Sequence, residues 1–124
     1  MIPFIIKPKG EITPGVSLDY KKGVFEISGW SYPEDAIIFY NPVLEGLSNY
    51  MQTPKSETTF HFKFQYYNTA TAKQIFKIIS CLMDVAKKSK VKICWHYDTN
   101  DTDMLASGKF FSKLATVPFE FISG

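Results

Sequence analysis

The hydrophobic period of this sequence changes inside one stretch, Phe60-His61-Phe62-Lys63-Phe64-Gln65-Tyr66-Tyr67-Asn68-Thr69-Ala70-Thr71-Ala72-Lys73. From Phe60 to Tyr66 apolar and polar residues alternate, which is the period of a strand with one buried face. After Asn68, apolar and small residues recur at helical spacing along one stripe, at Ala72, Ile75, Phe76, Ile79, Leu82, Met83 and Ala86. The stretch therefore predicts a strand that ends at the entrance of a helix.

This helix entrance carries two hydroxyl groups. Asn68 and Thr69 are residue types preferred at helix N-caps, so the helix is expected to begin here. Thr69 and Thr71 place hydroxyls, both expected to be exposed, where free backbone N–H groups and the helix dipole favour an anion. The residues alone allow two interpretations of these threonines. Thr69 is simply a cap, the commoner use of such a threonine, or one threonine is a phosphorylation switch that adds a charge of about −1.5 to −2.

Strands and helices are predicted alternately on both sides of this stretch. Strands are expected at residues 12–18, 24–28, 58–66, 91–97 and 118–122, and helices at residues 33–50, 68–86 and 104–114. Residues 20–23 form a hairpin turn between the first two strands, and residues 2–6 are a further short strand or an ordered arm. The order is therefore β-β-α-β-α-β-α-β.

Proline and glycine mark weak points in the predicted helices. The first helix is expected to have its cap at Ser31 or Tyr32 and Pro33 in its first turn. Pro42 lies inside that helix and is expected to kink or restart it. Gly108 weakens the last helix.

This order of elements predicts a single α/β (or α+β) domain over residues 1–124. Strands that alternate with helices imply right-handed crossovers and parallel pairing, and the hairpin adds antiparallel pairing, so the sheet is expected to be mixed. Because several strands alternate rather than run continuously apolar, helices are expected mainly on one face. The order is similar to that of STAS domains, the anti-sigma-factor antagonist fold, which says little about function by itself.

Composition excludes several classes of function. The chain is 45% hydrophobic with a net charge of +2, which lacks the basic excess of a nucleic-acid binder. No apolar run approaches the length that spans a membrane, and no signal peptide is expected. Cys81 and Cys94 stand outside any metal or disulfide motif, so both are interpreted as buried reduced thiols of a cytoplasmic protein.

The polar loop from His96 to Asp103 is the one candidate for a metal or ligand site. An EF-hand counted from Asp98 would need glycine at the sixth place and glutamate at the twelfth, where Asp103 and Lys109 stand. No phosphate loop or nucleophile elbow is present, so no enzyme, metal or cofactor is expected. Helix caps explain the loop better, and a small metal- or ligand-binding enzyme using it is the alternative function.

Four segments of the sequence are similar to segments of a known family. They are Ser28-Gly29-Trp30-Ser31-Tyr32-Pro33-Glu34, Phe39-Tyr40-Asn41-Pro42-Val43, Tyr66-Tyr67-Asn68-Thr69, and Trp95-His96-Tyr97-Asp98 with Asp101. In this order they resemble the SiaC family of bacterial regulatory phosphoproteins, formerly a domain of unknown function. The resemblance runs through almost the whole chain, from about Thr13 to Phe119.

The resemblance implies a non-enzymatic, partner-switching regulatory protein. In that family a dedicated kinase phosphorylates a threonine of the YxNT segment and a PP2C-type phosphatase removes the phosphate. The unphosphorylated form binds and activates a diguanylate cyclase, which raises cyclic di-GMP and promotes aggregation or biofilm growth. Here the implied phosphoacceptor is Thr69, with Thr71 as second choice. The partner-binding residues expected beside it are Tyr32, Glu34, Tyr67, Asn68 and Thr71.

Two departures from the family pattern are visible. Ala70 and Thr71 stand where serines are usual, and Gly46 stands where a large aromatic residue is common. A constitutive interaction domain, in which Thr69 is only a cap, is a third interpretation. In that case Thr69→Asp would leave partner binding unchanged, since aspartate also caps well.

Overall fold

The computed structural model describes residues 4–124. Over this range the elements are β1 (Phe4–Lys7), β2 (Gly15–Asp19), β3 (Val24–Ser31), α1 (Ala36–Tyr50), β4 (Glu57–Tyr67), α2 (Thr69–Val85), β5 (Lys90–Tyr97), α3 (Thr102–Leu114) and β6 (Phe119–Ser123). The predicted order is confirmed, and β1 precedes it. Of the arm or strand expected at residues 2–6, Ile2 and Pro3 lie outside the described residues.

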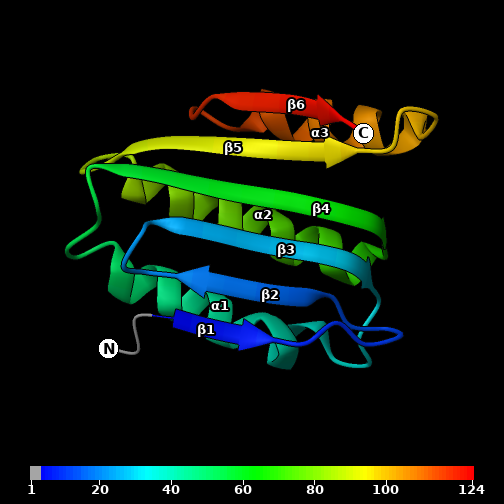
Figure 1. Cartoon of the computed structure of the whole chain (residues 1–124), viewed down its shortest axis with the longest axis horizontal. Helices are drawn as coiled ribbons and strands as arrows, with labels where there is room; N and C mark the ends of the chain where they lie inside the picture. The colour runs from blue at the N-terminus through cyan, green and yellow to red at the C-terminus, as the bar shows by residue number, and fades with distance from the viewer. Residues whose placement is uncertain (1–3) are drawn as a thin grey trace.

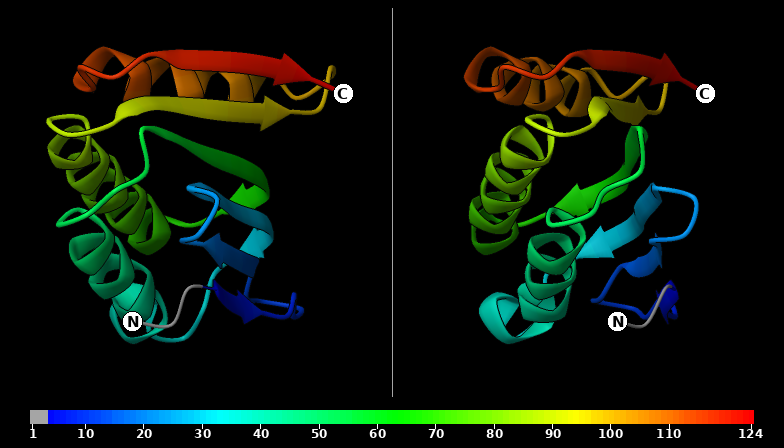
Figure 2. Two further views of the ribbon diagram at one scale, coloured as in Figure 1. Left: turned by 60° about the vertical axis from the view of Figure 1, so that its left-hand side comes forward. Right: turned by 90° about the vertical axis from the view of Figure 1, so that its left-hand side faces the viewer.

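All six strands form one sheet in the order β1-β2-β3-β4-β5-β6 (Figure 1). The pairs β1–β2 and β2–β3 are antiparallel, and β3–β4, β4–β5 and β5–β6 are parallel. The three helices lie on the same side of the sheet (Figure 2). Each parallel strand is added beyond the previous one, and each connecting helix crosses the same face, so the three crossovers share one hand. The predicted mixed sheet with helices on one face is confirmed.

The alternation of β4 explains why one face is covered and the other is polar. Phe60, Phe62 and Phe64 are buried beneath the helices, while His61 and Lys63 point to the face that lacks helices. Ion pairs on that open face join Glu26 to Lys63 at 2.8 Å and Lys92 to Glu120 at 3.1 Å. The core therefore lies between the sheet and the helices.

Helix α1 begins later than the sequence predicted. Its N-cap is Asp35, whose Oδ1 accepts a hydrogen bond of 3.1 Å from the N–H of Ile38. Ser31 is still the last residue of β3, where it is paired with Tyr67, and Tyr32 precedes a proline, which disfavours helical backbone. The predicted cap at Ser31 or Tyr32 is therefore wrong. The helix also continues through Pro42 without a break.

Helix α3 is continuous through Gly108, which serves close packing. A Cβ atom on Gly108 would collide with the indole ring of Trp95. The indole Nε1 donates a hydrogen bond of 2.9 Å to the carbonyl oxygen of Met104 in the same helix. The glycine therefore lets α3 lie directly on Trp95.

Both cysteines have free thiols, but their surroundings differ. Cys94 is buried, whereas Cys81 is only half-buried, so the expectation of two buried thiols is correct for Cys94 alone. Burial raises the pKa of both thiols. Within residues 4–124, no helix has the length and apolar character needed to cross a membrane.

Candidate functional site

The candidate site lies where β3 and β4 end and α2 begins. The backbone N–H of Asn68 donates to the carbonyl oxygen of Ser31 at 3.1 Å, which joins the ends of the two parallel strands. The side chain of Asn68 accepts a hydrogen bond of 2.9 Å from the N–H of Thr71, so Asn68 is the N-cap of α2. Thr69 is the first residue of the helix. The interpretation of Thr69 as the cap is therefore wrong.

Thr71 is an interior residue, with a relative exposure of 0%. Its hydroxyl lies 2.9 Å from the Oγ of Ser31 and donates to the Ser31 carbonyl oxygen at 3.1 Å. The same Oγ lies 2.6 Å from the hydroxyl of Tyr40 in α1. The expectation that the Thr71 hydroxyl is exposed is wrong, because this hydroxyl ties α2 to β3 and α1.

The Ser31–Tyr40–Thr71 cluster is uncharged. Burial raises the pKa of the Tyr40 phenol well above its ordinary value, and the hydrogen bonds from Ser31 and Thr71 offset only part of this effect. Buried hydroxyls that satisfy one another in this way hold the corner rigid. The cluster therefore supports the backbone that presents Thr69.

Thr69 is exposed and lies at the edge of a groove between α2 and α3. The groove has a volume of about 480 Å³ and is lined by Thr69, Ala72, Lys73, Phe76, Lys77, Phe110, Phe111 and Leu114. A phosphate on the Thr69 hydroxyl would lie at the positive end of the helix dipole, with Lys73 one turn further along α2. The local geometry can therefore accept an anion without a change of fold.

Among the predicted partner-binding residues, Tyr32 and Glu34 are exposed, and Tyr67 and Asn68 are half-buried. Tyr67 packs on Phe64, with ring centroids 5.3 Å apart. Glu34 lines a separate hollow of about 400 Å³ between α1 and α2, on the other side of Lys73. Of the five predicted residues, Thr71 is therefore buried, and Glu34 lines a different hollow from the groove beside Thr69.

Three exposed aromatic rings at the same corner were not predicted as a cluster. Tyr66 lies 5.6 Å from Trp30 and 5.8 Å from Tyr32, measured between ring centroids. A register shift between Gly29 and Trp30 places Trp30 opposite Tyr66. All three residues lie in the sequence segments that resemble a known family, so the sequence contained a signal for this surface. Their contact, however, depends on the register shift between Gly29 and Trp30.

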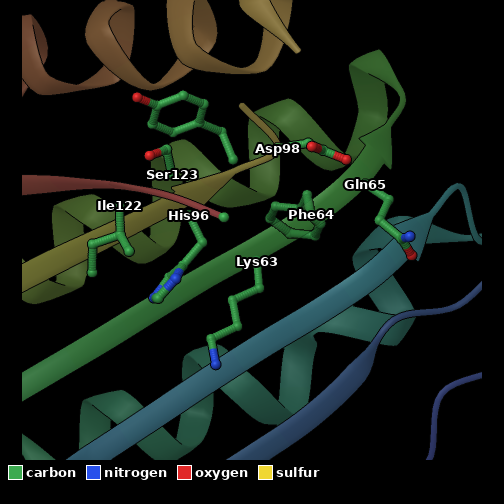
Figure 3. A pocket seen from close by; sticks show the side chains of 9 residues that line it. Lys63, Phe64, Gln65, His96, Asp98, Ile122 and Ser123 are labelled. Atoms are coloured by element: carbon green, nitrogen blue, oxygen red, sulfur yellow. The ribbon is translucent and has the colours of Figure 1, made fainter. Parts of the chain in front are cut away.

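The alternative site at His96 is a shallow pocket on the open face of the sheet. Its volume is about 290 Å³, and Lys63, His96, Asp98 and Ile122 are among the side chains that surround it (Figure 3). The Nε2 atom of His96 lies 2.9 Å from the Nδ1 atom of His61 on the neighbouring strand. Burial lowers the pKa of both imidazoles, and the charge of Lys63 lowers them further.

The loop that follows His96 contains the N-cap of α3. Asp101 is the N-cap of α3, and its Oδ1 accepts a hydrogen bond of 3.0 Å from the N–H of Met104. Among residues 4–124, no three histidine, cysteine, aspartate or glutamate side chains are arranged to hold a metal ion. The interpretation of Asp101 as a cap is confirmed, and the ion-binding alternative has no geometric support in the part of the chain that is described.

Fold and site together define a small α/β domain whose distinguishing feature is an exposed threonine at a helix entrance beside an apolar groove. Residues 7–124 match the sequence profile described as SiaC family regulatory phosphoprotein, so this chain belongs to the SiaC family. No curated protein sequence matches the chain.

Solved structures of similar fold come from Pseudomonas aeruginosa. Apo-SiaC is 21% identical, with a TM-score of 0.89, and the match covers 96% of this chain and 98% of that one. A structure described as diguanylate cyclase SiaD in complex with its activator SiaC contains a chain that is 20% identical, with a TM-score of 0.90 and coverage of 97% and 99%. At this identity the likeness shows a shared fold.

Proposed function

We propose that this chain is a non-catalytic switch protein in which phosphorylation of Thr69 controls binding to an effector. A dedicated kinase adds the phosphate and a PP2C-type phosphatase removes it. The unphosphorylated form binds and activates a diguanylate cyclase. Membership of a family of regulatory phosphoproteins supports this proposal, as does the description of a structurally similar protein, SiaC of Pseudomonas aeruginosa, as the activator of such a cyclase.

The observation that carries the proposal is the difference between two neighbouring threonines. Thr69 is exposed, and Asn68 rather than Thr69 caps the helix, so the Thr69 hydroxyl is available to a kinase. Thr71 is buried and its hydroxyl is held by Ser31. A kinase could reach Thr71 only by opening the corner between β3, α1 and α2. This difference in exposure supports Thr69, rather than Thr71, as the phosphoacceptor.

The switch acts through the surface rather than through the fold. A phosphate adds a charge of about −1.5 to −2 at the start of α2, where the helix dipole favours it, so the helix is not disrupted. The same charge changes what a partner meets at Tyr32, Tyr67 and Asn68 and in the groove beside Thr69. Thr71 contributes indirectly, because its hydrogen bonds to Ser31 hold this surface in place.

Phosphate mapping tests the site, and the chain offers a matched control. Thr102 is the first residue of α3, follows the N-cap Asp101 and is exposed, as Thr69 is in α2. It is flanked by Asp101 and Asp103, whose charges oppose a phosphate. After incubation with the cognate kinase and ATP, mass spectrometry should find one phosphate on wild type and on Thr102→Ala, and none on Thr69→Ala. Phosphate that persists on Thr69→Ala would overturn the assignment.

A further inference from the structure

A further hollow lies at the end of the sheet opposite to Thr69. Strands β3, β4, β5 and β6 all begin at this end, on the left-hand side of Figure 1, and β4 runs from here to the helix entrance. This basal hollow includes Lys22, Thr58, Ser89 and Lys90 among its lining residues. Its volume of about 660 Å³ lies within the range of small-molecule sites.

A chain of hydrogen-bonded hydroxyl groups ends in the basal hollow. The N–H of Lys55 donates to the Tyr50 hydroxyl at 3.1 Å. The Tyr50 hydroxyl lies 2.8 Å from Thr58 Oγ1, which in turn lies 2.6 Å from Ser89 Oγ. Tyr50 and Thr58 have relative exposures of 2% and 1%, and Ser89, at 9%, is the most exposed of these three hydroxyl residues. The chain therefore leads from the core to the wall of the hollow.

The direction of this chain leaves a free donor on Ser89. Each hydroxyl has one proton to donate. When Tyr50 donates to Thr58 and Thr58 donates to Ser89, both of these protons are satisfied, and the Ser89 proton has no acceptor among residues 4–124. The opposite direction would leave the Tyr50 proton unsatisfied in the core, which costs more than an unpaired proton at the wall of a hollow. The Ser89 hydroxyl is therefore available to an acceptor in the hollow.

The lining of the basal hollow has an excess of positive charge that helix capping does not explain. Lys22 lies in the β2–β3 turn, and Lys90 and Lys92 lie in β5. Lys92 pairs with Glu120 on the open face, whereas in the described part of the chain neither Lys22 nor Lys90 forms an ion pair. Glu57 is the one acidic residue among the described residues that line the hollow. The hollow therefore favours an anion.

We infer that the basal hollow binds a phosphate monoester whose phosphoryl oxygens accept hydrogen bonds from Ser89, Lys22 and Lys90. A phosphoryl group has three acceptor oxygens and a charge of about −1.5 to −2, which suits two unpaired ammonium groups and one hydroxyl donor. A carboxylate has a single charge and two oxygens, so it matches this set of donors less well. The side chains of Val24 and Val117 give the organic part of the ligand an apolar wall.

Two small probes that differ in their acidic group test the inference directly. Phenyl phosphate and phenylacetate share an aromatic ring, so a difference in affinity reports on the phosphoryl group. Amide chemical shifts of the isotope-labelled full chain measure both affinity and location. Phenyl phosphate should bind about tenfold more tightly and shift the amides of residues 57–59, 89–92 and 116–118. Equal affinities, or shifts confined to other residues, would overturn the inference.

A matched pair of double variants separates the basal hollow from general attraction to nearby lysines. Lys22→Gln/Lys90→Gln should weaken the binding of phenyl phosphate about tenfold, and Ser89→Ala about fivefold. Lys21→Gln/Lys87→Gln removes two charges from exposed neighbours that do not line the hollow, so it should keep the affinity of wild type. Circular dichroism establishes that each variant is folded. Equal losses in the two double variants, or full affinity in Ser89→Ala, would overturn the inference.

A phosphate monoester can be a free metabolite or a lipid headgroup, and vesicles distinguish these sources. Cosedimentation with phosphatidylcholine vesicles that contain phosphatidic acid, when it is lost in Lys22→Gln/Lys90→Gln, assigns the ligand to a membrane surface. Binding of phenyl phosphate without cosedimentation assigns it to a free metabolite. Thr69→Asp should bind phenyl phosphate as wild type does, because Thr69 lies at the other end of β4. The basal site therefore stands or fails independently of the proposed switch.

Discussion

The Thr71 hydroxyl links three elements at the corner where β3 and β4 end. Thr69 and Thr71 are two residues apart, and each residue of a helix turns by about 100°, so their side chains point in nearly opposite directions. Thr71 shares its face with Ile75, Ile78 and Leu82, which are all buried. This spacing is visible in the sequence and would have placed Thr71 in the interior, but the capping chemistry of threonine pointed to an exposed site.

Removal of the Thr71 hydroxyl should destabilise the protein. Thr71→Val keeps the shape of the side chain but removes the partner of the Ser31 Oγ and a donor to the Ser31 carbonyl, so we expect a loss of about 1–3 kcal/mol in the free energy of unfolding. Thr69→Val, at the exposed site, should change it by no more than about 0.5 kcal/mol. Urea denaturation measures both values. A Thr71→Val protein as stable as wild type would contradict this account of the corner.

Gly46 is explained by its neighbour Tyr20. A Cβ atom on Gly46 would collide with the Tyr20 hydroxyl, so the tyrosine occupies the space beside the glycine. The Tyr20 hydroxyl is buried and finds no hydrogen-bond partner among the described residues. In family members with a large aromatic residue at this place, that side chain would need the volume that Tyr20 fills here.

The contact between Tyr20 and Gly46 predicts that their substitutions are coupled. Gly46→Ala alone should destabilise the protein by about 1–3 kcal/mol through overpacking, although alanine has the higher helix propensity. Tyr20→Phe removes an unsatisfied buried hydroxyl and should stabilise the protein by about 1 kcal/mol. Thermal unfolding of the two single variants and the double variant measures the coupling. Strictly additive effects would mean that the two side chains do not share this space.

Among the helices and strands, hydrophobic periodicity predicted the elements that have one buried face. Strand pairing determined an element boundary that the sequence did not predict. The strands near residues 24–28, 58–66 and 91–97 were predicted because each has one covered face. The start of α1 was not predicted correctly. Serine is a residue type preferred at helix N-caps, but Ser31 is a strand residue that pairs with Tyr67. Local capping preferences of about 1 kcal/mol are outweighed by such pairing.

The histidine pair between β4 and β5 predicts a dependence of stability on pH. Burial lowers the pKa of His61 and His96 below the ordinary value of 6.5, and Lys63 adds to the effect in each. The unfolded chain therefore binds protons more readily than the folded one. The contribution of the pair is fully present above a pH of 6.5 and decreases as the pH falls below this value.

Urea denaturation between neutral and mildly acidic pH tests this dependence. His61→Gln/His96→Gln should show a smaller decrease in the free energy of unfolding than wild type as the pH falls. Glu26 and Glu120 also lie near the pair and act in the opposite direction, since their charges raise the pKa of both histidines. An identical decrease in wild type and in the double variant would show that the pair does not contribute.

In the whole molecule, helices cover only one face of the sheet, so the open face and the helical face differ in character. The open face carries ion pairs and the histidine pair, while the helical face carries the apolar groove beside Thr69. One-sided coverage was predicted from the alternating strands. The groove was not predicted, because Phe76 and Phe110 are far apart in the sequence and line the same groove only through the spacing of α2 and α3. A stripe of apolar residues indicates a buried face, but it does not show where packing is left incomplete.

In the proposed mechanism, a single phosphate on Thr69 switches the protein from a cyclase-activating to an inactive form. The most direct measurement is the rate of cyclic di-GMP synthesis by the purified partner cyclase with one preparation of this chain in three successive states: unmodified, phosphorylated by the kinase, and dephosphorylated by the PP2C-type phosphatase. We predict activation, loss of activation and recovery, with Thr69→Ala active throughout. Equal activation by the phosphorylated and unmodified forms would contradict the account.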